Sequence, residues 1–365
     1  MTHLFGKVYT GKSVLITGHT GFKGSWLTYW LQKMGAIVTG YSLPAPTEPN
    51  HWSLLSLPIA HHLGDIREQV AMQAVFDQHQ PEIVFHLAAQ PLVRYSYQHP
   101  IETLDTNILG TAKVLECVRH TPSVRAVVII SSDKCYENPE DGHPLTETER
   151  MGGYDPYSVS KGCTELITSS YRRSYFNHKH YGQKHQVLIA SGRAGNVIGG
   201  GDWATDRLIP DLVKSTVSGH QVIIRNPLAV RPWQHVLEPL SGYLLVGQRL
   251  LEGHTNVADG WNFGPNSNDV LPVREVIRLA RQIWPAIDCN EFSFESNPHE
   301  AHLLSLDCTK AHAQLAWRPV WDTPTAIART IGWYRRWYQQ RQILSHQDLE
   351  HYIETARQAN LIWTQ

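Results

Sequence analysis

The sequence predicts a doubly wound α/β fold in which helices cover both faces of a parallel sheet. Apolar runs of strand length alternate with helical patterns through the first half of the 365-residue chain. The runs are continuously hydrophobic, which is typical of strands that are buried on both faces. We expect such strands at residues 13–17, 37–39, 82–85 and 125–130. A glycine-rich turn directly after the first run favours the same fold class.

Apolar residues at helical spacing predict the helices that join these strands. One helix is expected over residues 24–34 and another over residues 107–119. The apolar stripes of these two helices consist of Trp26, Leu27, Trp30 and Leu31 in the first, and Ile108, Ala112, Leu115 and Val118 in the second.

The turn after the first strand has glycines at positions 18, 21 and 24. In a dinucleotide-binding turn, Gly18 permits the tight bend, Gly21 lets the backbone approach a pyrophosphate, and Gly24 permits close helix packing. Thr20, Phe22 and Lys23 lie within the same segment. The turn therefore predicts a Rossmann domain that binds a dinucleotide, the alternative being an ordinary glycine-rich turn.

The second strand lacks the acidic residue that usually holds the ribose of NAD, and Ser42 stands near that point. No arginine lies there either, so the sequence favours NAD over NADP. Asp65 and Ile66 follow the next strand region and are expected at the adenine. The small residues after the following strand, Leu87, Ala88 and Ala89, are expected to let the backbone approach the cofactor.

Changes in composition divide the chain into three parts. We expect the NAD-binding Rossmann domain over residues 1–190 and a smaller substrate-binding α/β region over 191–338, from which some chain returns to the first domain. Residues 339–365 form a C-terminal tail. Leu349, Tyr352, Ile353 and Ala356 are at helical spacing, which predicts an amphipathic helix that covers an apolar surface.

The composition excludes several classes of protein. Lys plus Arg (32) nearly balance Asp plus Glu (33), which argues against nucleic-acid binding. No apolar run approaches the ~20 residues that span a bilayer, and the N-terminus lacks a signal-peptide core. We expect a cytoplasmic protein that has no membrane partner. The five cysteines are scattered and never in C-x-x-C spacing, so we expect neither disulfides nor a metal site.

The candidate catalytic pair is Tyr157 with Lys161, one helical turn apart. Asp155 is a suitable N-cap and Pro156 suits the first position of their helix, whose expected buried stripe is Val159, Cys163, Leu166 and Ile167. A second Y-x-x-x-K at residues 175–179 runs into a His-rich loop and is set aside.

Ser132 ends the preceding strand, at the edge where α/β sheets bind ligands, and can share a hydrogen bond with Tyr157. We expect the Lys161 ammonium to lower the pKa of Tyr157 and make it a usable base toward a sugar hydroxyl. The alternative is a tyrosine with a structural role.

Five segments of the chain carry a resemblance to a known family. They are TGHTGFKGSW (residues 17–26), FHLAAQPLVR (85–94), SDKCYEN (132–138), RAGNVIGGGDW (193–203) and RPWQHV (231–236). These segments resemble those of the CDP-glucose 4,6-dehydratases, which belong to the extended short-chain dehydrogenase/reductase superfamily. The resemblance extends from about residue 12 to residue 338 and leaves the tail outside.

What the resemblance implies is a lyase that converts CDP-glucose to CDP-4-dehydro-6-deoxyglucose and water. Hydride passes from C4 of the sugar to NAD, water is lost across C5 and C6, and the hydride returns to C6. Asp133 would be the acid for water loss, and Lys134 occupies the site of the C5 base, where relatives acting on dTDP-glucose carry glutamate. The alternative is that Lys134 stabilises the enolate while another group removes the proton.

The resemblance also implies the substrate and cofactor contacts. Gln90, Arg94, Asn196, Arg207, Leu208 and Arg231 would contact the nucleotide sugar, and Arg193 would contact the cofactor. Surface salt bridges are the alternative for the two diphosphate-binding arginines, 207 and 231. His299 and Glu300 are weaker candidates in a charged loop. A homodimer or homotetramer, and a role in deoxysugar and polysaccharide biosynthesis, are further implications.

Three other functions remain open from the sequence. A nucleotide-sugar 4-epimerase shares the turn and the Tyr157/Lys161 pair but does not need the pair at 133 and 134. A 4,6-dehydratase of another nucleotide sugar would share all of these residues. A non-catalytic dinucleotide sensor is the remote alternative, against which the intact Ser132, Tyr157 and Lys161 argue.

Overall fold

The structure is a computed structural model that describes residues 1–224, 226–266, 269–291 and 304–365. Its centre is a parallel sheet that has seven strands among the described residues, in the order β3-β2-β1-β4-β5-β6-β11. The strands are β1 Ser13–Thr17, β2 Ile37–Ser42, β3 Ala60–Leu63, β4 Ile83–His86, β5 Ala126–Ile130, β6 Leu188–Ala194 and β11 Gly260–Phe263. The doubly wound prediction is confirmed, and the four expected strands correspond to β1, β2, β4 and β5.

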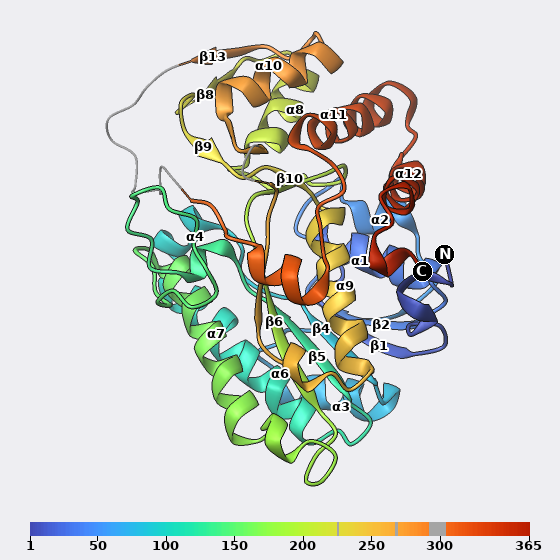
Figure 1. Cartoon of the computed structure of the whole chain (residues 1–365). Helices are drawn as coiled ribbons and strands as arrows, with labels where there is room; N and C mark the ends of the chain where they lie inside the picture. The colour runs from blue at the N-terminus through green and yellow to red at the C-terminus, as the bar shows by residue number, and fades with distance from the viewer. Residues whose placement is uncertain (225, 267–268, 292–303) are drawn as a thin grey trace.

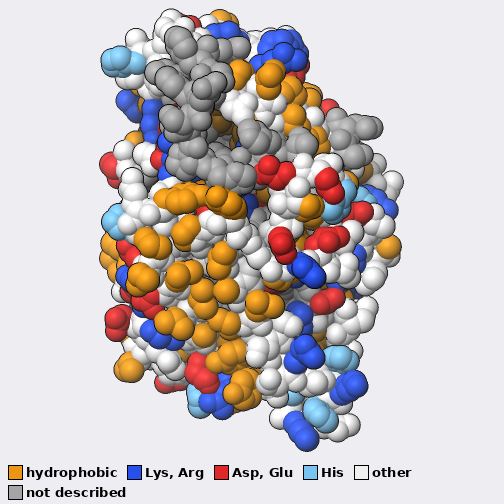
Figure 2. All heavy atoms as spheres, turned by 90° about the vertical axis from the view of Figure 1, so that its left-hand side faces the viewer, with side chains coloured by type: hydrophobic (Ala, Val, Ile, Leu, Met, Phe, Trp, Pro, Cys, Tyr) orange, Lys and Arg blue, Asp and Glu red, His pale blue; other side chains and the backbone are white. Residues whose placement is uncertain are grey.

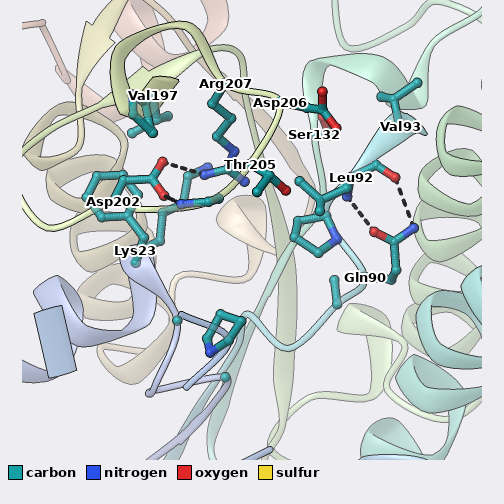
Figure 3. A pocket seen from close by; sticks show the side chains of 18 of the residues that line it. Lys23, Gln90, Leu92, Val93, Ser132, Val197, Asp202, Thr205, Asp206 and Arg207 are labelled. Atoms are coloured by element: carbon teal, nitrogen blue, oxygen red, sulfur yellow. Dashed lines mark hydrogen bonds and ion pairs between the residues drawn. The ribbon is translucent and has the colours of Figure 1, made fainter. Parts of the chain in front are cut away.

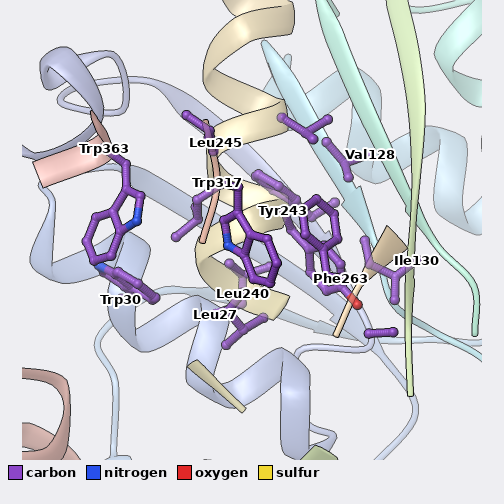
Figure 4. Close-up of a cluster of buried hydrophobic side chains, with 14 of the residues drawn as sticks. Leu27, Trp30, Val128, Ile130, Leu240, Tyr243, Leu245, Phe263, Trp317 and Trp363 are labelled. Carbon is purple, nitrogen blue, oxygen red and sulfur yellow. The ribbon is translucent and has the colours of Figure 1, made fainter. Parts of the chain in front are cut away.

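Helices cover both faces of the sheet (Figure 1). Helices α1 Phe22–Lys33 and α9 Leu237–Leu251 pack on one face, and α3 Gln69–His79, α6 Gly110–Arg119 and α7 Pro156–Ser174 pack on the other. Val14 and Ile16 of β1 point toward the first face and Leu15 toward the second, because side chains alternate along a strand. Figure 4 shows the first core, where Leu240 and Tyr243 of α9 lie beside Phe263 of β11.

Shorter helices fill the connections. They are η1 Leu4–Lys7, α2 His51–Leu55, α4 Val93–Gln98, α5 Pro100–Leu104, η2 Asp105–Leu109, η3 Asp133–Cys135, η4 His178–His180, η5 Thr255–Val257 and η7 Ala311–Leu315. The helix expected over residues 24–34 is α1. The one expected over 107–119 begins as the π-helical turn η2 and continues as α6.

A second group of elements lies above the carboxyl ends of the strands (Figure 1). Within the described ranges it contains α8 Leu208–Ser218, α10 Val273–Ile283 and α11 Thr323–Gln340 with three two-stranded sheets. The strand pairs are β7 Val197–Ile198 with β10 Gln234–His235, β8 Val222–Ile224 with β13 Cys289–Glu291, and β9 Val230–Arg231 with β12 Leu271–Pro272. These elements have their own apolar core, while α9 and β11 return to the central sheet.

The C-terminal tail packs against the sheet domain. Helix α12 Ser345–Gln358 buries the expected stripe of Leu349, Tyr352, Ile353 and Ala356, and the short η8 Ile362–Thr364 follows it. The ring of Trp363 stacks on Phe5 near the N-terminus at 5.3 Å between centroids. The predicted amphipathic helix is therefore confirmed, and it covers the core next to α1 and α9.

The expected buried stripe of α7 is wrong in part. Ile167 packs against the second core and Cys163 is half-buried, but Val159 and Leu166 are exposed. The face that packs inward also carries small polar residues such as Ser160, Thr164 and Thr168. The hydroxyls of Thr164 and Thr168 donate to carbonyls one turn earlier, which satisfies them in the interior. Val159 and Leu166 therefore form an apolar face of α7 that points outward.

Candidate active site

One cavity of about 900 Å³ opens at the carboxyl ends of the central strands, between the sheet and the second group of elements. This is the edge where doubly wound sheets bind ligands. The sequence-predicted residues that line it are Gly18, Thr20, Gly21, Phe22, Lys23, Gly24, Ser42, Asp65, Ile66, Leu87, Ala88, Ala89, Gln90, Ser132, Asp133, Lys134, Tyr157, Lys161, Asn196, Arg207, Leu208 and Arg231. Residues far apart in the sequence thus meet in a single site.

The glycine turn closes tightly at the first strand. Gly18 has a φ of +78°, and a Cβ there would lie 2.7 Å from the backbone nitrogen of Ala88. A Cβ at Gly24 would collide with the Gly18 carbonyl. Gly21 is the N-cap of α1, so the first amides of that helix face the cavity. The turn has the shape and the free amides that a dinucleotide pyrophosphate needs.

The ends of β2 and β3 form the far wall. The Thr20 hydroxyl lies 2.8 Å from the Ser42 hydroxyl and donates to the Leu43 carbonyl. Arg67, which the sequence analysis missed, also lines the cavity and pairs with the Asp65 carboxylate at 2.7 Å. The guanidinium holds the pKa of Asp65 below its ordinary value. Asp65 is therefore an ionised acceptor at the expected adenine end.

Tyr157 lies in the first turn of α7, which the Asp155 side chain caps by accepting from the Ser158 amide at 2.9 Å. Lys161 is one turn further, with its Nζ 5.9 Å from the centre of the Tyr157 ring. Both side chains are buried, and Ser132 hydrogen-bonds to the Tyr157 hydroxyl. The structure brings the three predicted residues together.

The expectation that Lys161 lowers the pKa of Tyr157 is not met. Burial raises the pKa of Tyr157 to about 12, while the hydrogen bond with Ser132 acts in the opposite direction. Burial also lowers the pKa of Lys161 to about 8. Desolvation is the largest cause of both pKa shifts, because both side chains are taken out of water.

Asp133 and Lys134 follow Ser132 in the short helix η3. The Asp133 carboxylate is buried and accepts a hydrogen bond from the Ser132 hydroxyl at 2.9 Å. Burial raises the pKa of Asp133, against the positive charges of Lys134, Lys23 and Arg231. A buried carboxyl with a raised pKa among these cations is suited to donate a proton.

Several cations face the middle of the cavity. Arg207 donates to the Asp202 carboxylate at 2.7 Å, as Figure 3 shows, and Lys23 lies close to this pair. Burial, helped by the charge of Arg207, lowers the pKa of Lys23 to about 8. Arg231 lines the same part of the cavity. In a chain of balanced charge, this cluster is a local site for an anion.

Three predicted contacts need correction or refinement. Arg193 does not line the cavity, because its guanidinium is buried against the Glu165 carboxylate at 2.8 Å, on the side of β6 that faces α7. Arg94 does not line it either, and lies 3.8 Å from Asp206. Gln90 does line it, but its amide is engaged by the Leu92 backbone (Figure 3) and the Thr103 hydroxyl.

Sequence reasoning also missed residues in the second group of elements. Asp202, Asp211, Asn226 and Trp233 all line the cavity. Asp202 and Trp233 lie within the segments that carried the resemblance, so the sequence held a signal from which they could have been predicted as site residues. Asp211 and Asn226 carry no such signal. His299 and Glu300 lie outside the described residues.

Comparisons with known proteins agree with this geometry. A family model described as GDP-mannose 4,6 dehydratase matches residues 15–330. A CDP-glucose 4,6-dehydratase of Salmonella typhimurium is 50% identical over 352 residues, covering 95% of this chain and 98% of the relative. The chain belongs to this nucleotide-sugar 4,6-dehydratase family. The match covers 95% of the chain, which is more than residues 12–338. The expectation that the whole C-terminal tail lies outside the resemblance is therefore wrong.

More distant members and neighbours share the fold. A dTDP-glucose 4,6-dehydratase of Haemophilus influenzae is 26% identical over 74% of this chain and 81% of its own length. Among solved structures, an epimerase from Methanothermobacter thermautotrophicus has a TM-score of 0.78 at 24% identity, covering 93% of this dehydratase-family chain and 95% of its own. A dTDP-glucose 4,6-dehydratase of Bacillus anthracis, solved with NAD, has a TM-score of 0.73 at 20% identity, covering 91% and 98%.

Proposed function

We propose that the protein converts CDP-D-glucose to CDP-4-dehydro-6-deoxy-D-glucose and water, with NAD as a cofactor that each cycle regenerates. The observation that carries this proposal is the 50% identity to a CDP-glucose 4,6-dehydratase over nearly the whole of both chains. The cavity supports it, because a dinucleotide turn, a serine–tyrosine–lysine group and an aspartate–lysine pair all line it.

The residues present fit the cofactor. Gly18, Gly21 and Gly24 leave room that a Cβ would fill, and the first amides of α1 can hold the pyrophosphate. Asp65 with Ile66 can hold the adenine end, and Leu87 to Ala89 form the floor between β4 and the cavity. When bound there, NAD would supply the hydride acceptor and donor that the cycle requires.

Tyr157 is the proposed base for the C4 hydroxyl of glucose. Its buried hydroxyl already shares a hydrogen bond with Ser132. Ser132 can therefore hold the sugar C4 oxygen next to the Tyr157 hydroxyl. Because the pKa of Tyr157 is raised to about 12, proton transfer needs positive charge nearby. Lys161 supplies such a charge from within the same helix turn.

Asp133 and Lys134 are proposed to serve the loss of water. Asp133, buried with a raised pKa, donates a proton to the departing C6 hydroxyl. Lys134 stands beside it and acts on the C5 proton or on the enolate that its removal creates. A carbonyl at C4 makes the C5 proton acidic, so the two residues act only after the first step.

Residues 191–338 are proposed to bind most of the nucleotide sugar. Arg207, Arg231, Leu208 and Asn196 all line the cavity. In this proposal the two arginines bind the diphosphate, Leu208 contacts the nucleotide, and Asn196 contacts the sugar. A guanidinium fork matches phosphate oxygens well, which supports the two arginines in this role.

The test is to incubate the purified protein with CDP-, dTDP-, UDP- and GDP-sugars and to follow the formation of a 4-keto sugar. We expect turnover of CDP-glucose in preference to dTDP-glucose, without added reductant. Water loss separates this activity from that of a 4-epimerase, whose product would keep the oxygen at C6. Failure to turn over any of these sugars would contradict the proposal and revive the non-catalytic sensor.

The outward apolar face of α7 supports a second copy of this chain as a partner. Figure 2 shows hydrophobic side chains gathered on this side of the molecule, and Ile101, Leu109, Val159 and Leu166 are among the exposed ones. Such a patch is characteristic of an interaction site. We propose a homodimer through these helices, or a tetramer built from it, and expect Leu166→Glu to yield monomers in light scattering. An unchanged mass would contradict this interface.

The cellular setting is also a proposal. Among the described residues, no helix combines the length and the apolarity that crossing a membrane requires. A cytoplasmic location and a role in making deoxysugars for a polysaccharide agree with a water-soluble nucleotide-sugar substrate. Immunoblotting of separated cell fractions tests the location.

A further inference from the structure

The C-terminal helix α12 reaches the wall of the cavity. It lies beside α1 and α2 (Figure 1), and its first residue, Ser345, is buried. The Ser345 hydroxyl lies 2.8 Å from Nε2 of His51, which is the first residue of α2. His51 is also buried, and it lines the cavity. A buried polar contact thus joins the C-terminal tail to the wall of the cavity.

The other ring nitrogen of His51 reaches the first turn of α1. Nδ1 lies 2.9 Å from the Ser25 hydroxyl. The amide of Ser25 closes this turn by donating to the Gly21 carbonyl at 2.8 Å, and the Ser25 hydroxyl donates to the Phe22 carbonyl at 2.9 Å. Gly21 and Phe22 line the cavity, and the amides of this turn are proposed to hold the pyrophosphate. His51 thus lies between the tail and the cofactor turn.

The direction of each hydrogen bond follows from the number of protons. A serine hydroxyl has one proton, and the Ser25 proton is used on a carbonyl, so Nδ1 of His51 is the donor to Ser25. Burial lowers the pKa of His51 to about 3, so the ring is neutral and Nε2 is an acceptor. The Ser345 hydroxyl therefore donates to Nε2, and its oxygen accepts from the Trp333 indole at 3.0 Å. Each hydrogen bond of this series fixes the direction of the next.

The surroundings hold the His51 ring in one orientation. The ring stacks on Trp26 of α1, with the ring centres 4.8 Å apart. A Cβ at Gly201 would lie 2.6 Å from the Cβ of His51, so the backbone of a neighbouring loop packs directly against this residue. Without the Ser345 hydroxyl, Nε2 would be unpaired in the interior. Any shift of the ring that relieves this cost would move Nδ1 away from Ser25.

We propose that the C-terminal helix contributes to cofactor binding, because Ser345 positions His51 and His51 holds the first turn of α1 in the shape that binds the NAD pyrophosphate. That turn binds through backbone amides, whose directions depend on the course of the backbone. The hydrogen bond from Nδ1 to the Ser25 oxygen fixes this course. His51 and Ser345 are therefore positioning residues. The inference rests on the proposed function for the place of the pyrophosphate.

The test is the binding of NAD to Ser345→Ala, measured by calorimetry at 15 °C where the variant stays folded. The loss of one buried hydrogen bond predicts a dissociation constant that rises roughly three- to tenfold. A dissociation constant within twofold of wild type in folded Ser345→Ala would overturn the inference.

Tyr29→Phe is the matched control for general support by the tail. The Tyr29 hydroxyl joins the same two helices, since it lies 3.0 Å from Nδ1 of His346 in α12. We expect this variant to bind NAD within twofold of wild type, because Tyr29 does not line the cavity and has no printed bond to the first turn of α1. An equal loss of affinity in Tyr29→Phe would contradict the inference.

His51→Phe keeps a ring but removes the link between the tail and the turn. We expect it to bind NAD at least as weakly as Ser345→Ala does. Adding Ser345→Ala to it should change the affinity less than twofold, because Ser345 acts through His51. A further loss in the double variant would show that Ser345 acts by another route. Wild-type affinity in His51→Phe would also refute the inference, and it decides the question if Ser345→Ala does not fold.

The binding measurement separates this inference from the proposed function, because NAD binding needs no sugar. A protein that turns over no nucleotide sugar but loses NAD affinity in Ser345→Ala would contradict the proposed function alone. A working dehydratase whose NAD affinity is the same in Ser345→Ala would contradict the inference alone.

Discussion

Replacing Arg193 by methionine tests whether this residue stabilises the fold rather than binding the cofactor. Its guanidinium and the Glu165 carboxylate are nearly fully buried, with side-chain exposures of 6% and 4%. Glu165 also accepts hydrogen bonds from Ser131 and Ser191, and Arg193 donates to the Tyr136 hydroxyl at 2.7 Å. Removing the cation leaves a buried carboxylate without its charge partner.

The expected cost follows from that burial. Breaking a buried ion pair by removing one partner costs about 3–5 kcal/mol. At about 2 °C per kcal/mol for a chain of this size, Tm should fall by ~6–10 °C. Adding Glu165→Gln to the variant removes the unpaired buried charge and should recover part of the lost stability.

The assays are thermal and urea unfolding followed by circular dichroism, and NAD binding measured at 15 °C where the variant stays folded. We expect NAD affinity to stay within about threefold of wild type, because Arg193 does not line the cavity. A variant with wild-type stability and more than tenfold weaker NAD binding would refute this reasoning. It would support the cofactor contact that the sequence analysis assigned to Arg193.

Four further outcomes are expected. Gly24→Ala should lose NAD affinity and stability together, because a Cβ there collides with the Gly18 carbonyl, and an unchanged titration would argue against the tight turn. Burial raises the pKa of Asp348 to about 7, so the native protein keeps a proton that the unfolded chain loses near pH ~4. Stability should therefore fall as pH rises from about 4 to about 7, and Asp348→Asn should flatten that slope in unfolding at several pH values. Tyr157→Phe should lose at least ~10²-fold in kcat and show an isotope effect with substrate deuterated at C4. Lys134→Met should show the isotope effect with deuterium at C5, and an effect at C4 would move Lys134 to the first step.

The central sheet was predictable because its strands are long enough to leave a pattern. Residues 14–16 and 126–130 are continuously apolar, and the strands that contain them are buried on two faces. The strands of the second group are two or three residues long, as in β7 and β9, and such pieces carry no periodicity. Their position depends on packing between distant segments, which one sequence does not reveal.

The parts of the site that were predictable from the sequence are those whose residues lie close together in one turn or one helix. Gly18 to Gly24 and the Tyr157–Lys161 pair have spacings that place them on one turn or one helix face. Which face of α7 packs against the sheet was not predictable in this way. Its inner face carries Ser160 and Thr164, whose hydroxyls donate to backbone carbonyls of the same helix. An apolar stripe alone does not tell whether a helix packs against its own sheet or toward another molecule.

The pKa of Tyr157 was predicted in the wrong direction for a related reason. A lysine one turn away lowers the pKa of a phenol when both are solvated, but here both groups are buried and desolvation dominates. The depth of burial comes from the whole fold and not from the spacing of two residues.

The most direct test of the proposed reaction is transfer of label within one molecule. CDP-glucose deuterated at C4 is incubated with the enzyme and NAD, and the product is examined by mass spectrometry and NMR. The internal cycle predicts a 4-keto-6-deoxy sugar that carries the deuterium at C6, without added reductant. Deuterium lost to solvent, or a product that keeps its C6 oxygen, would contradict it.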